Sequence, residues 1–431
     1  MPPVIALRDI SRYEGRDVSV RGWLYHRRSA GKLEFLIVRD GSGYVQVVAF
    51  EKDLPPEVFE TCRRLTQESS LIVSGPVRRD ERSPWGYEIG LRDLEVVHLA
   101  EEYPIGPKEH GVAFLMEHRH LWLRSSKQHA VLRVRSEASL ACREFLHSEG
   151  FTCVDSPILT PTSCEGTSTL FETDYFGSKA FLSQSGQLYQ ESACMVFGRT
   201  YCFGPTFRAE KSKTRRHLTE FWMLEPEMAF ATLDDAIELA ERLCCAVVER
   251  VLDRNREDLK RLERDTSRLE QLRAPFPRLT YEQALHRLKE HNVDVPWGDD
   301  FGGDDETVLA SIEEIPIVVH RYPATLKPFY MQPDPEDSRL VLNFDLMAPE
   351  GHGEIIGGSQ RIHDEDLLRK QMRAEGLDEA AFRWYLEIRR FGTVPHSGFG
   401  LGIERLVGWI TGILHLREAI PFPRTLNRLY P

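Results

Sequence analysis

The residues best suited to chemistry lie at positions 207–230, in the run FRAEKSKTRRHLTEFWMLEPEMAF. The run predicts a strand, a basic loop and a returning strand. Arg208 and Glu210 fall on one face of the first strand, because side chains alternate along an extended chain, and Phe221 and Glu225 share a face of the second. Cations, an aromatic ring and carboxylates on one hairpin suit a nucleotide, which needs partners for its phosphates, its base and its amino group. The alternative is a charged surface hairpin with ordinary salt bridges.

A second stretch, SGFGLGIERLVGW at residues 397–409, combines alternating glycines with charge. The glycines from Gly398 to Gly402 leave one face of a predicted strand without side chains, which marks the close approach of a ligand or of another backbone. Glu404 and Arg405 follow at once and open an apolar run of helical character. Taken alone, the glycines could equally serve only the close packing of this strand against its neighbours.

In this order, the two stretches resemble motifs 2 (residues 203–230) and 3 (residues 397–412) of the class II aminoacyl-tRNA synthetases. The resemblance is to the aspartyl/asparaginyl subgroup and covers essentially the whole chain. It implies an α+β fold, with an N-terminal OB-fold β-barrel and a class II catalytic domain whose antiparallel sheet is flanked by helices. Residues 126–157, a helical pattern followed by a strand that stops at Pro157, resemble motif 1, which forms the family's subunit interface and implies a homodimer.

The resemblance implies an ATP site with Arg208 and Arg405 as its catalytic residues. Arg208 would bind the α-phosphate and stabilise the charge of the transition state, which is usually the largest catalytic contribution. Arg405 would contact the γ-phosphate and one face of the adenine. The other contacts would come from Glu210 to the adenine amino group, from His217 to the terminal phosphates and from Phe221 to the second adenine face.

Two acidic residues on successive predicted strands, Asp345 and Glu354, match the subgroup's ligands for the magnesium that bridges the ATP phosphates. Mg²⁺ takes one or two carboxylates together with phosphate oxygens and water, so two acids suffice. Acidic residues on strands are otherwise often surface groups. The aspartyl enzymes carry a serine three positions after the glutamate, whereas this chain has Gly357, as asparaginyl enzymes do. The expected cofactors are therefore ATP and Mg²⁺, with the exact metal shell left open.

The amino-acid pocket implied by the resemblance consists of Glu165, Gln187, Gln190, Glu225 and Arg361. Glu165 would hold the α-ammonium by a charge-assisted hydrogen bond, and Gln187 would contact the same head group. Gln190 stands where the aspartyl enzymes carry the lysine that binds the substrate carboxylate, so it favours an uncharged substrate. Arg361 would donate to the carboxamide oxygen of asparagine, while Glu225 accepts from its nitrogen and repels aspartate. Glu225 as an ordinary salt-bridge partner inside the sheet is the alternative.

Residues 18–97 consist of short alternating runs that are separated by glycine and charged turns. Five strands with one helix, at residues 55–67 after the third strand, predict a small OB-type barrel. Such barrels often bind single-stranded nucleic acid through stacked aromatic rings and a basic rim, although a charged rim can also be merely solvated. The resemblance implies an anticodon-binding domain, with base stacking by Phe35, base-edge hydrogen bonding by Gln46 and backbone contacts from Arg21 and Arg28.

The predicted boundaries place the OB barrel at residues 1–100, a hinge or linker rich in proline, glycine and charge at 101–123, and the catalytic domain at 124–431. Within the catalytic domain, residues 233–273 have helical character throughout, apolar at helical period in the first half and highly charged in the second. Residues 294–307 are acidic and glycine-rich and predict a surface loop.

The length, charge and cysteine content of the chain exclude some classes of protein. A chain of 431 residues is too long for one compact core, and its net charge of −12 argues against a nonspecific nucleic-acid binder. The eight cysteines form no CxxC pair and no zinc-ligand spacing with histidine, a usage that fits a reducing cytoplasm. The N-terminus lacks the pattern of a signal peptide, and no apolar run reaches transmembrane length.

The resemblance, taken with this composition, implies a cytoplasmic homodimer that would ligate asparagine to tRNA(Asn) through an asparaginyl-adenylate, using ATP, with no membrane association. The nearest alternative is an aspartyl-tRNA synthetase, including one that does not discriminate between the two amino acids; Gln190, Glu225 and Gly357 speak against it. An ammonia-dependent asparagine synthetase of the same fold would lack the N-terminal barrel. A non-catalytic RNA-binding relative would have lost Arg208 or Arg405, and both are present.

Overall fold

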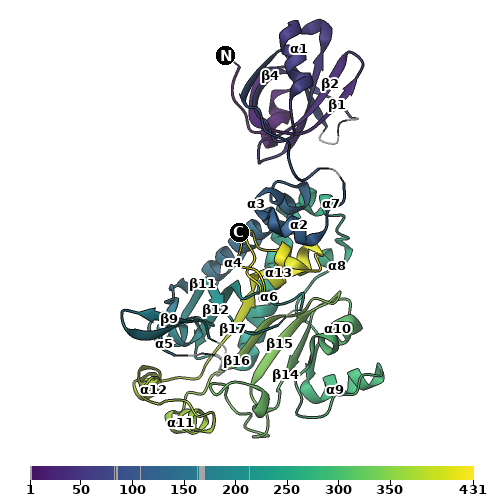
Figure 1. The fold of residues 1–431 in the computed structure, drawn as a ribbon. Helices are drawn as coiled ribbons and strands as arrows, with labels where there is room; N and C mark the ends of the chain where they lie inside the picture. The colour runs from purple at the N-terminus through teal and green to yellow at the C-terminus, as the bar shows by residue number, and fades with distance from the viewer. Residues whose placement is uncertain are drawn as a thin grey trace. The chain divides into compact units, whose positions relative to one another are not determined.

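The structure, a computed structural model, describes residues 2–81, 83, 86–106, 108–162, 164, 170–212 and 214–431. The chain divides into two compact units, Met1–Gly111 and Val112–Pro431. Figure 1 follows the chain from the first unit, in purple, into the second, which ends in yellow. Each unit buries a hydrophobic core of its own, as expected for a chain too long for a single core.

The first unit is a β-barrel that closes because its first and fourth strands pair. The strand order β1-β2-β3-β5-β4 returns to β1, and β6 pairs with β4 as a sixth strand. Alternate residues, such as Val18 and Val20 on β1 and Leu36 on β2, fill the interior. The elements are a 3-10 helix (Leu7–Tyr13), β1 (Asp17–Ala30), β2 (Leu33–Arg39), β3 (Tyr44–Phe50), a short 3-10 turn (Glu51–Asp53), α1 (Pro56–Arg64), β4 (Ser70–Arg79), β5 (Tyr87–Gly90) and β6 (Asp93–His98). The predicted OB-type barrel is confirmed.

The last predicted strand of the barrel is two strands rather than one. β5 pairs with β3 and with the end of β4, whereas β6 runs along the beginning of β4. The chain changes partners between them, where the N–H of Leu91 donates to the carbonyl of Val48 and that of Arg92 to the carbonyl of Ser74, both at 2.8 Å. Alternation along the sequence indicates extended chain but does not say with which neighbour it pairs.

The linker predicted at residues 101–123 is too long at its C-terminal end, because α2 (Val112–Glu117) and α3 (Arg119–Trp122) belong to the second unit. Arg119 anchors them and is fully buried. Its guanidinium donates to the carbonyls of Ile420 and Pro421 and to Oε1 of Gln128, at 2.7–2.8 Å. Because three polar acceptors surround a buried cation, this segment is fixed to the C-terminal end of the chain rather than hinged.

The second unit is built on an eight-stranded sheet with the order β13-β14-β15-β16-β17-β12-β11-β7. Its inner pairings are antiparallel, as predicted, but the outermost pairs β13–β14 and β11–β7 are parallel. The strands are β7 (Thr152–Cys153), β11 (Arg199–Phe207), β12 (Glu220–Ala229), β13 (Arg278–Thr280), β14 (Ile317–His320), β15 (Asn343–Ala348), β16 (Gly353–Gln360) and β17 (His396–Gly402). A smaller sheet consists of β8 (Leu159–Thr160), β9 (Glu172–Tyr175) and β10 (Ser178–Leu182).

One face of the large sheet is covered by the long helices α4 (Ser126–Ser148) and α6 (Leu233–Arg254), together with α13 (Ile403–Thr411). The core between them holds Val134 of α4, Leu243 of α6 and Leu406 of α13, packed against Phe399 and Leu401 of β17. Because strand residues alternate between faces, the glycines of β17 and the polar residues of β12 lie on the opposite face. The covered face therefore leaves the other one for the functional groups.

The helical character predicted for residues 233–273 is divided among three helices. α6 ends at Arg254, and α7 (Arg256–Arg261) and α8 (Ser267–Glu270) follow as separate short helices. Asn255 ends α6 and begins α7, with its side-chain amide donating to Asp258 at 2.9 Å. The remaining helices are α5 (Gln187–Phe197), α9 (Tyr281–Glu290), α10 (Gly303–Ile312), α11 (Glu365–Ala374) and α12 (Arg383–Arg390), with 3-10 turns at Ala324–Leu326 and Leu416–Glu418. α10 occupies part of the predicted loop 294–307.

Within the described ranges, none of the helices combines the length and the apolar character needed to cross a bilayer.

Candidate active site

The hairpin predicted at residues 207–230 consists of β11 and β12, which pair in register from Arg199 and Met228 to Phe207 and Glu220. The first strand is shorter than predicted, so Arg208 and Glu210 lie just beyond it instead of within it. The N–H of Arg208 still donates to the carbonyl of Thr219 at 3.0 Å, which continues the hairpin by one bond. Both side chains nevertheless face the cavity described next.

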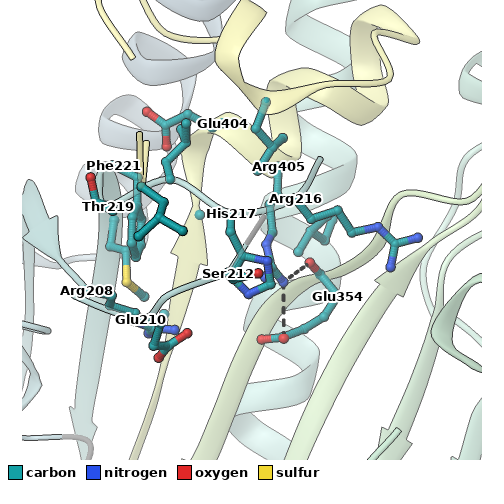
Figure 2. A pocket seen from close by; sticks show the side chains of 17 residues that line it. Arg208, Glu210, Ser212, Arg216, His217, Thr219, Phe221, Glu354, Glu404 and Arg405 are labelled. Carbon is teal, nitrogen blue, oxygen red and sulfur yellow. Dashed lines mark hydrogen bonds and ion pairs between the residues drawn. The ribbon is translucent and has the colours of Figure 1, made fainter. Parts of the chain in front are cut away.

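The cavity lies between this hairpin and the start of α13, over β16 and β17 (Figure 2). It brings together all the residues predicted to bind ATP. These are Arg208, Glu210, His217, Phe221, Glu354 and Arg405. The two arginines predicted to be catalytic, Arg208 and Arg405, come from the regions that resemble motifs 2 and 3, and the fold places both in the walls of one cavity.

Arg405 is held in place from both of its ends. One of its terminal nitrogens donates to the backbone carbonyl of Glu354 at 2.6 Å and to its carboxylate at 3.1 Å, which Figure 2 shows as dashed lines. At the other end, Glu404 accepts from the N–H of Trp222 at 3.1 Å and pairs with Arg135 at 2.8 Å. These contacts fix the first turn of α13 against β12, so the guanidinium of Arg405 is preorganised toward the cavity.

The aromatic and imidazole groups of the cavity complete a site for a nucleotide. The guanidinium of Arg208 lies 5.3 Å from the ring centroid of Phe221, within reach of the attraction between a cation and an aromatic face. Burial, helped by the nearby charge of Arg405, lowers the pKa of His217 below its ordinary value. His217 is therefore neutral near pH 7 and can donate a hydrogen bond to an anionic oxygen without adding a buried charge.

A second cavity adjoins the first, and Arg208, Glu210 and Glu354 line both. Its far wall carries the predicted pair Glu225 and Arg361. Both side chains are buried, and each already has a protein partner. The carboxylate of Glu225 accepts from the hydroxyl of Ser185 and from the N–H of Gly186, the latter at 2.9 Å. Arg361 forms a bidentate pair with Glu227, at 2.9 and 3.1 Å, and donates to Ser359 at 2.7 Å.

The alternating glycines of β17 make room for side chains of the neighbouring strand. A Cβ at Gly398 would overlap the carboxylate of Glu227, and one at Gly400 would overlap the methyl end of Met223. Since these side chains line the second cavity, the glycines allow β12 to point its functional groups across β17. The close approach predicted for this face is real, but the approaching groups in this structure belong to β12.

The two predicted metal ligands lie on adjacent strands and share the second cavity. A Cβ on Gly357, which faces Asp345 across the strand pair, would lie 2.9 Å from Oε1 of Glu354 and 3.4 Å from Oδ1 of Asp345. Glycine therefore keeps the space between the carboxylates open. Burial raises the pKa of Asp345, and repulsion from Glu354 adds to the rise, a strain that a cation between them would relieve. An oxygen-only pair of this kind fits Mg²⁺.

Among the described residues, no third acidic side chain joins Asp345 and Glu354 in a metal site. In the part of the chain that the structure describes, no group of three or more His, Cys, Asp or Glu side chains gathers as a metal site. Lys327 instead reaches Asp345 with its ammonium, 2.9 Å from Oδ2. Burial works to lower the pKa of Lys327, but the carboxylates of Asp345, Asp300 and Glu354 together outweigh burial and raise that pKa. The cavity therefore carries fixed positive charge suited to phosphate oxygens.

Comparison with known proteins identifies the family to which this architecture belongs. Residues 112–426 match the family described as tRNA synthetases class II (D, K and N), and residues 18–99 match the OB-fold nucleic acid binding domain. The chain belongs to the class II tRNA synthetases.

Several relatives that match this class II synthetase over nearly its full length are asparagine–tRNA ligases. That of Chloroflexus aurantiacus is 56% identical over 436 residues, which cover 100% of this chain and 99% of the relative. That of Symbiobacterium thermophilum is 56% identical over 429 residues and covers 98% of each. Asparaginyl-tRNA synthetase from Pyrococcus horikoshii, solved with asparaginyl-adenylate, is 43% identical with a TM-score of 0.96 over 100% of both chains. A putative aspartyl-tRNA synthetase from Leishmania major is 25% identical, with a TM-score of 0.87 over 100% of this chain and 95% of its own.

Gln190, which was predicted to favour an uncharged substrate, does not line the second cavity in the described structure, and its role in selecting against aspartate stays a prediction. Its amide nitrogen donates to the carbonyl of Val154 at 2.7 Å and to the hydroxyl of Ser156 at 3.0 Å, behind the cavity. α5 begins at Gln187, and a helix turns about 100° per residue. Gln187 lines the cavity, and Gln190, three residues later, lies about 60° around the helix axis from it.

We expect Gln190→Lys to leave the preference for asparagine over aspartate unchanged, because the new ammonium enters a buried socket outside the cavity. The variant should lose about 1–3 kcal/mol of unfolding free energy, the usual effect of a buried polar group that loses its hydrogen bonds. Amino-acid-dependent ATP–pyrophosphate exchange and a chemical melt measure the two effects. A gain in aspartate-dependent exchange would instead support the predicted role of Gln190 in selection. Gln190→Met, which removes the same hydrogen bonds without a charge, is the matched control.

The remaining predicted site residues belong to the amino-acid pocket and to the OB unit. Glu165 lies outside the described residues. Gln187 lines the cavity, and its amide nitrogen donates to Glu191 at 3.0 Å. In the OB unit, Arg28 pairs with Phe35 across β1 and β2 and places its guanidinium 4.8 Å from the ring centroid. Gln46 of β3 lies on the same outward face and donates to Glu88 at 3.4 Å, and Arg21 is exposed on the outward face of β1.

Three polar residues near the site were missed. Glu227 lies on the same strand face as Glu225, so alternation points to it, but its partner Arg361 is remote in the sequence. Lys327 lies in an irregular segment whose pattern carries no periodic signal. Glu191 is fully buried beside Gln187. Helical periodicity was the only sequence signal that placed this glutamate at a core position, where charged residues are rarely found.

Proposed function

We propose that this chain activates asparagine with ATP to asparaginyl-adenylate and then transfers the asparaginyl group to the terminal adenosine of tRNA(Asn). The observation that carries the proposal is that the two cavities adjoin and share Arg208, Glu210 and Glu354. One cavity carries the groups suited to a nucleotide, and the other the groups suited to an uncharged carboxamide. The high identity to asparagine–tRNA ligases over the full length supports the same reaction.

Catalysis in this site needs positioning and charge stabilisation rather than proton transfer. The α-carboxylate of asparagine is already a nucleophile, so no general base is required for attack on the α-phosphorus. Arg208, which lines both cavities, is placed to stabilise the charge that builds up at the point where the two substrates meet. Arg405 holds the far end of the nucleotide, with pyrophosphate as the leaving group.

Magnesium would suit the same site, and Asp345 and Glu354 are the residues that would hold it. Burial works to raise the pKa of Glu354, but the charges of Arg405 and Lys327 outweigh it and lower that pKa, so this carboxylate is ionised at neutral pH. The bound ion would neutralise phosphate charge and orient the triphosphate. Lys327, which holds Asp345 in place, would then face the phosphate oxygens.

Selection of asparagine over aspartate rests on the polar walls of the second cavity. Glu225 would accept from the carboxamide nitrogen and Arg361 would donate to the carboxamide oxygen. Aspartate would bring a second carboxylate against Glu225 and Glu227, and like charges in a buried site cost several kcal/mol. Ser185 and Gly186, which hold Glu225 through both of its oxygens, keep this acceptor at a fixed position.

The experiment that tests the proposal is ATP–pyrophosphate exchange with asparagine and with aspartate in parallel. We expect exchange with asparagine only. Preferential exchange with aspartate would identify an aspartyl-tRNA synthetase, and equal exchange a non-discriminating one. Formation of asparagine from aspartate, ATP and ammonium would identify an asparagine synthetase. The absence of exchange with either amino acid would favour a non-catalytic RNA-binding protein.

Anticodon binding by the OB unit is proposed for Phe35, Gln46, Arg21 and Arg28. We expect Phe35→Ala to raise the KM for tRNA about 5- to 150-fold, because stacking of one base on an aromatic ring is worth about 1–3 kcal/mol. ATP–pyrophosphate exchange should not change, since the catalytic unit has its own core. Val97→Ala, at an exposed apolar position on β6, is the matched control. An unchanged KM for tRNA in the Phe35 variant would contradict the assignment.

A homodimer and a cytoplasmic location belong to the same proposal. Apolar side chains stand exposed in and beside motif 1, namely Leu140, Ile158 and Leu159, and a subunit interface would cover them. Among the described residues, the cysteines are free thiols, as a reducing compartment requires. Analytical ultracentrifugation of the protein at micromolar concentration checks the assembly, and a sedimenting mass of one chain would contradict it.

A further inference from the structure

A buried carboxylate stands directly behind the amino-acid cavity. Glu191, on α5, is fully buried, and donors from three elements converge on it. The hydroxyl of Tyr385 lies 2.8 Å from both of its oxygens, His396 Nε2 lies 3.0 Å from Oε2, and Arg389 also donates to Oε2. Its remaining donor is the amide nitrogen of Gln187, 3.0 Å from Oε1.

The contact between Glu191 and Gln187 determines which end of the glutamine amide faces the cavity. An ionised carboxylate only accepts hydrogen bonds, whereas an amide has a donating and an accepting end. The amide of Gln187 must therefore present its nitrogen to Glu191 and turn its carbonyl oxygen the other way. Because Gln187 lines the amino-acid cavity, that oxygen is the end available to a ligand there.

Two further observations fix this arrangement. Burial works to raise the pKa of Glu191, but the charges of Arg389 and His396 outweigh it and lower that pKa, so the group is ionised. The backbone N–H of Gln187 donates to the hydroxyl of Ser185 at 3.0 Å, and that hydroxyl donates to Glu225. The glutamine is thus held at its backbone and at its amide nitrogen, which leaves its carbonyl oxygen as a preorganised acceptor.

We propose that Glu191 is a positioning residue for the α-ammonium of the amino-acid substrate, and that it acts by holding the carbonyl oxygen of Gln187 toward the cavity. The inference rests on the proposed function, since it assumes that an α-amino acid binds in this cavity. An ammonium has three donors and no acceptor, so an amide carbonyl is a suitable partner and an amide nitrogen is not. Glu191 therefore contributes to substrate binding without touching the substrate.

The competing explanation is that Glu191 only ties α5 to α12 and β17. A substitution that reverses the glutamine amide separates the two explanations. In Glu191→Gln, the new side-chain oxygen belongs at the Oε2 position, where Arg389, His396 and Tyr385 all donate. The new NH₂ group then faces Gln187. Gln187 must turn its carbonyl toward that donor and its own nitrogen toward the cavity.

We expect Glu191→Gln to raise the KM for asparagine about 10- to 150-fold, the usual effect of losing a hydrogen bond to a charged group. The KM for ATP and kcat for ATP–pyrophosphate exchange should change less than about threefold, since the nucleotide groups are untouched. Binding of 3-carbamoylpropanoate, which is asparagine without its amino group, should not weaken. An equal loss for both ligands, or no change in the KM for asparagine, would overturn the proposal.

A double variant tests whether the lost affinity for asparagine can be restored. In the double variant Gln187→Glu/Glu191→Gln, the carboxylate at 187 accepts from the amide at 191 and offers its other oxygen to the cavity. The KM for asparagine should then return to within about fivefold of the original, measured against the single variant. Failure of the double variant to recover any affinity, with both proteins folded, would count against the proposed role of the amide direction.

Tyr385→Phe is the matched control, because it removes one donor to the same carboxylate and leaves the hydrogen bond from Gln187 to Glu191 in place. It should lower the melting temperature and leave the KM for asparagine unchanged. If Tyr385→Phe reproduces the KM effect of Glu191→Gln, the network is only structural and the proposal fails. The unsubstituted protein distinguishes a failure of the proposed function from a failure of the role of Glu191. If the unsubstituted protein shows no asparagine-dependent exchange, the proposed function is wrong and the role of Glu191 has not been contradicted.

Discussion

We expect Arg208→Ala to abolish measurable adenylate formation and to leave the fold intact. Removing one preorganised donor from a developing negative charge typically costs about 100- to 1,000-fold in kcat. We expect at least this loss, because Arg208 is the only arginine that lines both the nucleotide and the amino-acid cavities among the described residues. The measurement is asparagine-dependent ATP–pyrophosphate exchange under saturating substrate.

The reason to expect an unchanged fold is the position of Arg208. It lies half-buried just beyond the end of β11, outside the hydrophobic core of the catalytic unit. The melting temperature of the Arg208→Ala variant should match that of the original protein within a few degrees. Lys211→Ala, which removes an exposed cation from the same loop but outside both cavities, is the control and should retain exchange. Exchange in Arg208→Ala within about tenfold of normal would remove Arg208 from the catalytic machinery.

Arg361→Met has the second largest expected effect, on both stability and activity. Arg361 and Glu227 are almost completely buried and form a bidentate pair. Removing one partner leaves an uncompensated buried charge, which typically costs about 3–5 kcal/mol of unfolding free energy. Burial already raises the pKa of Glu227 despite the presence of Arg361, so the variant should also take up a proton at this carboxylate. Asparagine-dependent exchange should be lost with the donor to the carboxamide oxygen.

The double variant Arg361→Met/Glu227→Gln separates the two effects. Replacing both charges removes the unpaired carboxylate, so most of the lost unfolding free energy should return in a urea melt. Exchange should not return, because the donor that faces the substrate side chain is still missing. Recovery of exchange together with stability would show that Arg361 only supports the fold. A single variant as stable as the original protein would contradict the energetic argument.

The fold and the nucleotide site were largely predictable because their signals are local. The alternation of Phe221, Met223 and Glu225 places them on one strand face wherever the strand lies, and the glycines of β17 carry the same two-residue period. Apolar residues at helical spacing along α4 indicate which side is buried. The direction of Gln190 was not predictable in this way, because it depends on where α5 begins.

The partners of the buried charges depend on contacts between remote segments. Glu191 meets Tyr385, Arg389 and His396 only when α5, α12 and β17 come together. Lys327 reaches Asp345 from an irregular segment, and Arg119 is enclosed by the carbonyls of the C-terminal tail. A charged residue in a sequence looks the same whether it will be solvated or buried, so these pairings had no signal before folding.

The amino-acid sequence by itself determined the family motifs, the faces of the strands that carry them and therefore the residue types available to ATP and asparagine. The tertiary structure decided which of those groups meet a substrate and which meet each other. Side-chain alternation is a property of the local backbone, whereas the orientation of Gln187, Gln190 and Arg361 depends on donors and acceptors supplied by other segments. A buried polar side chain needs a hydrogen-bond partner, and such partners come together only when the chain has folded.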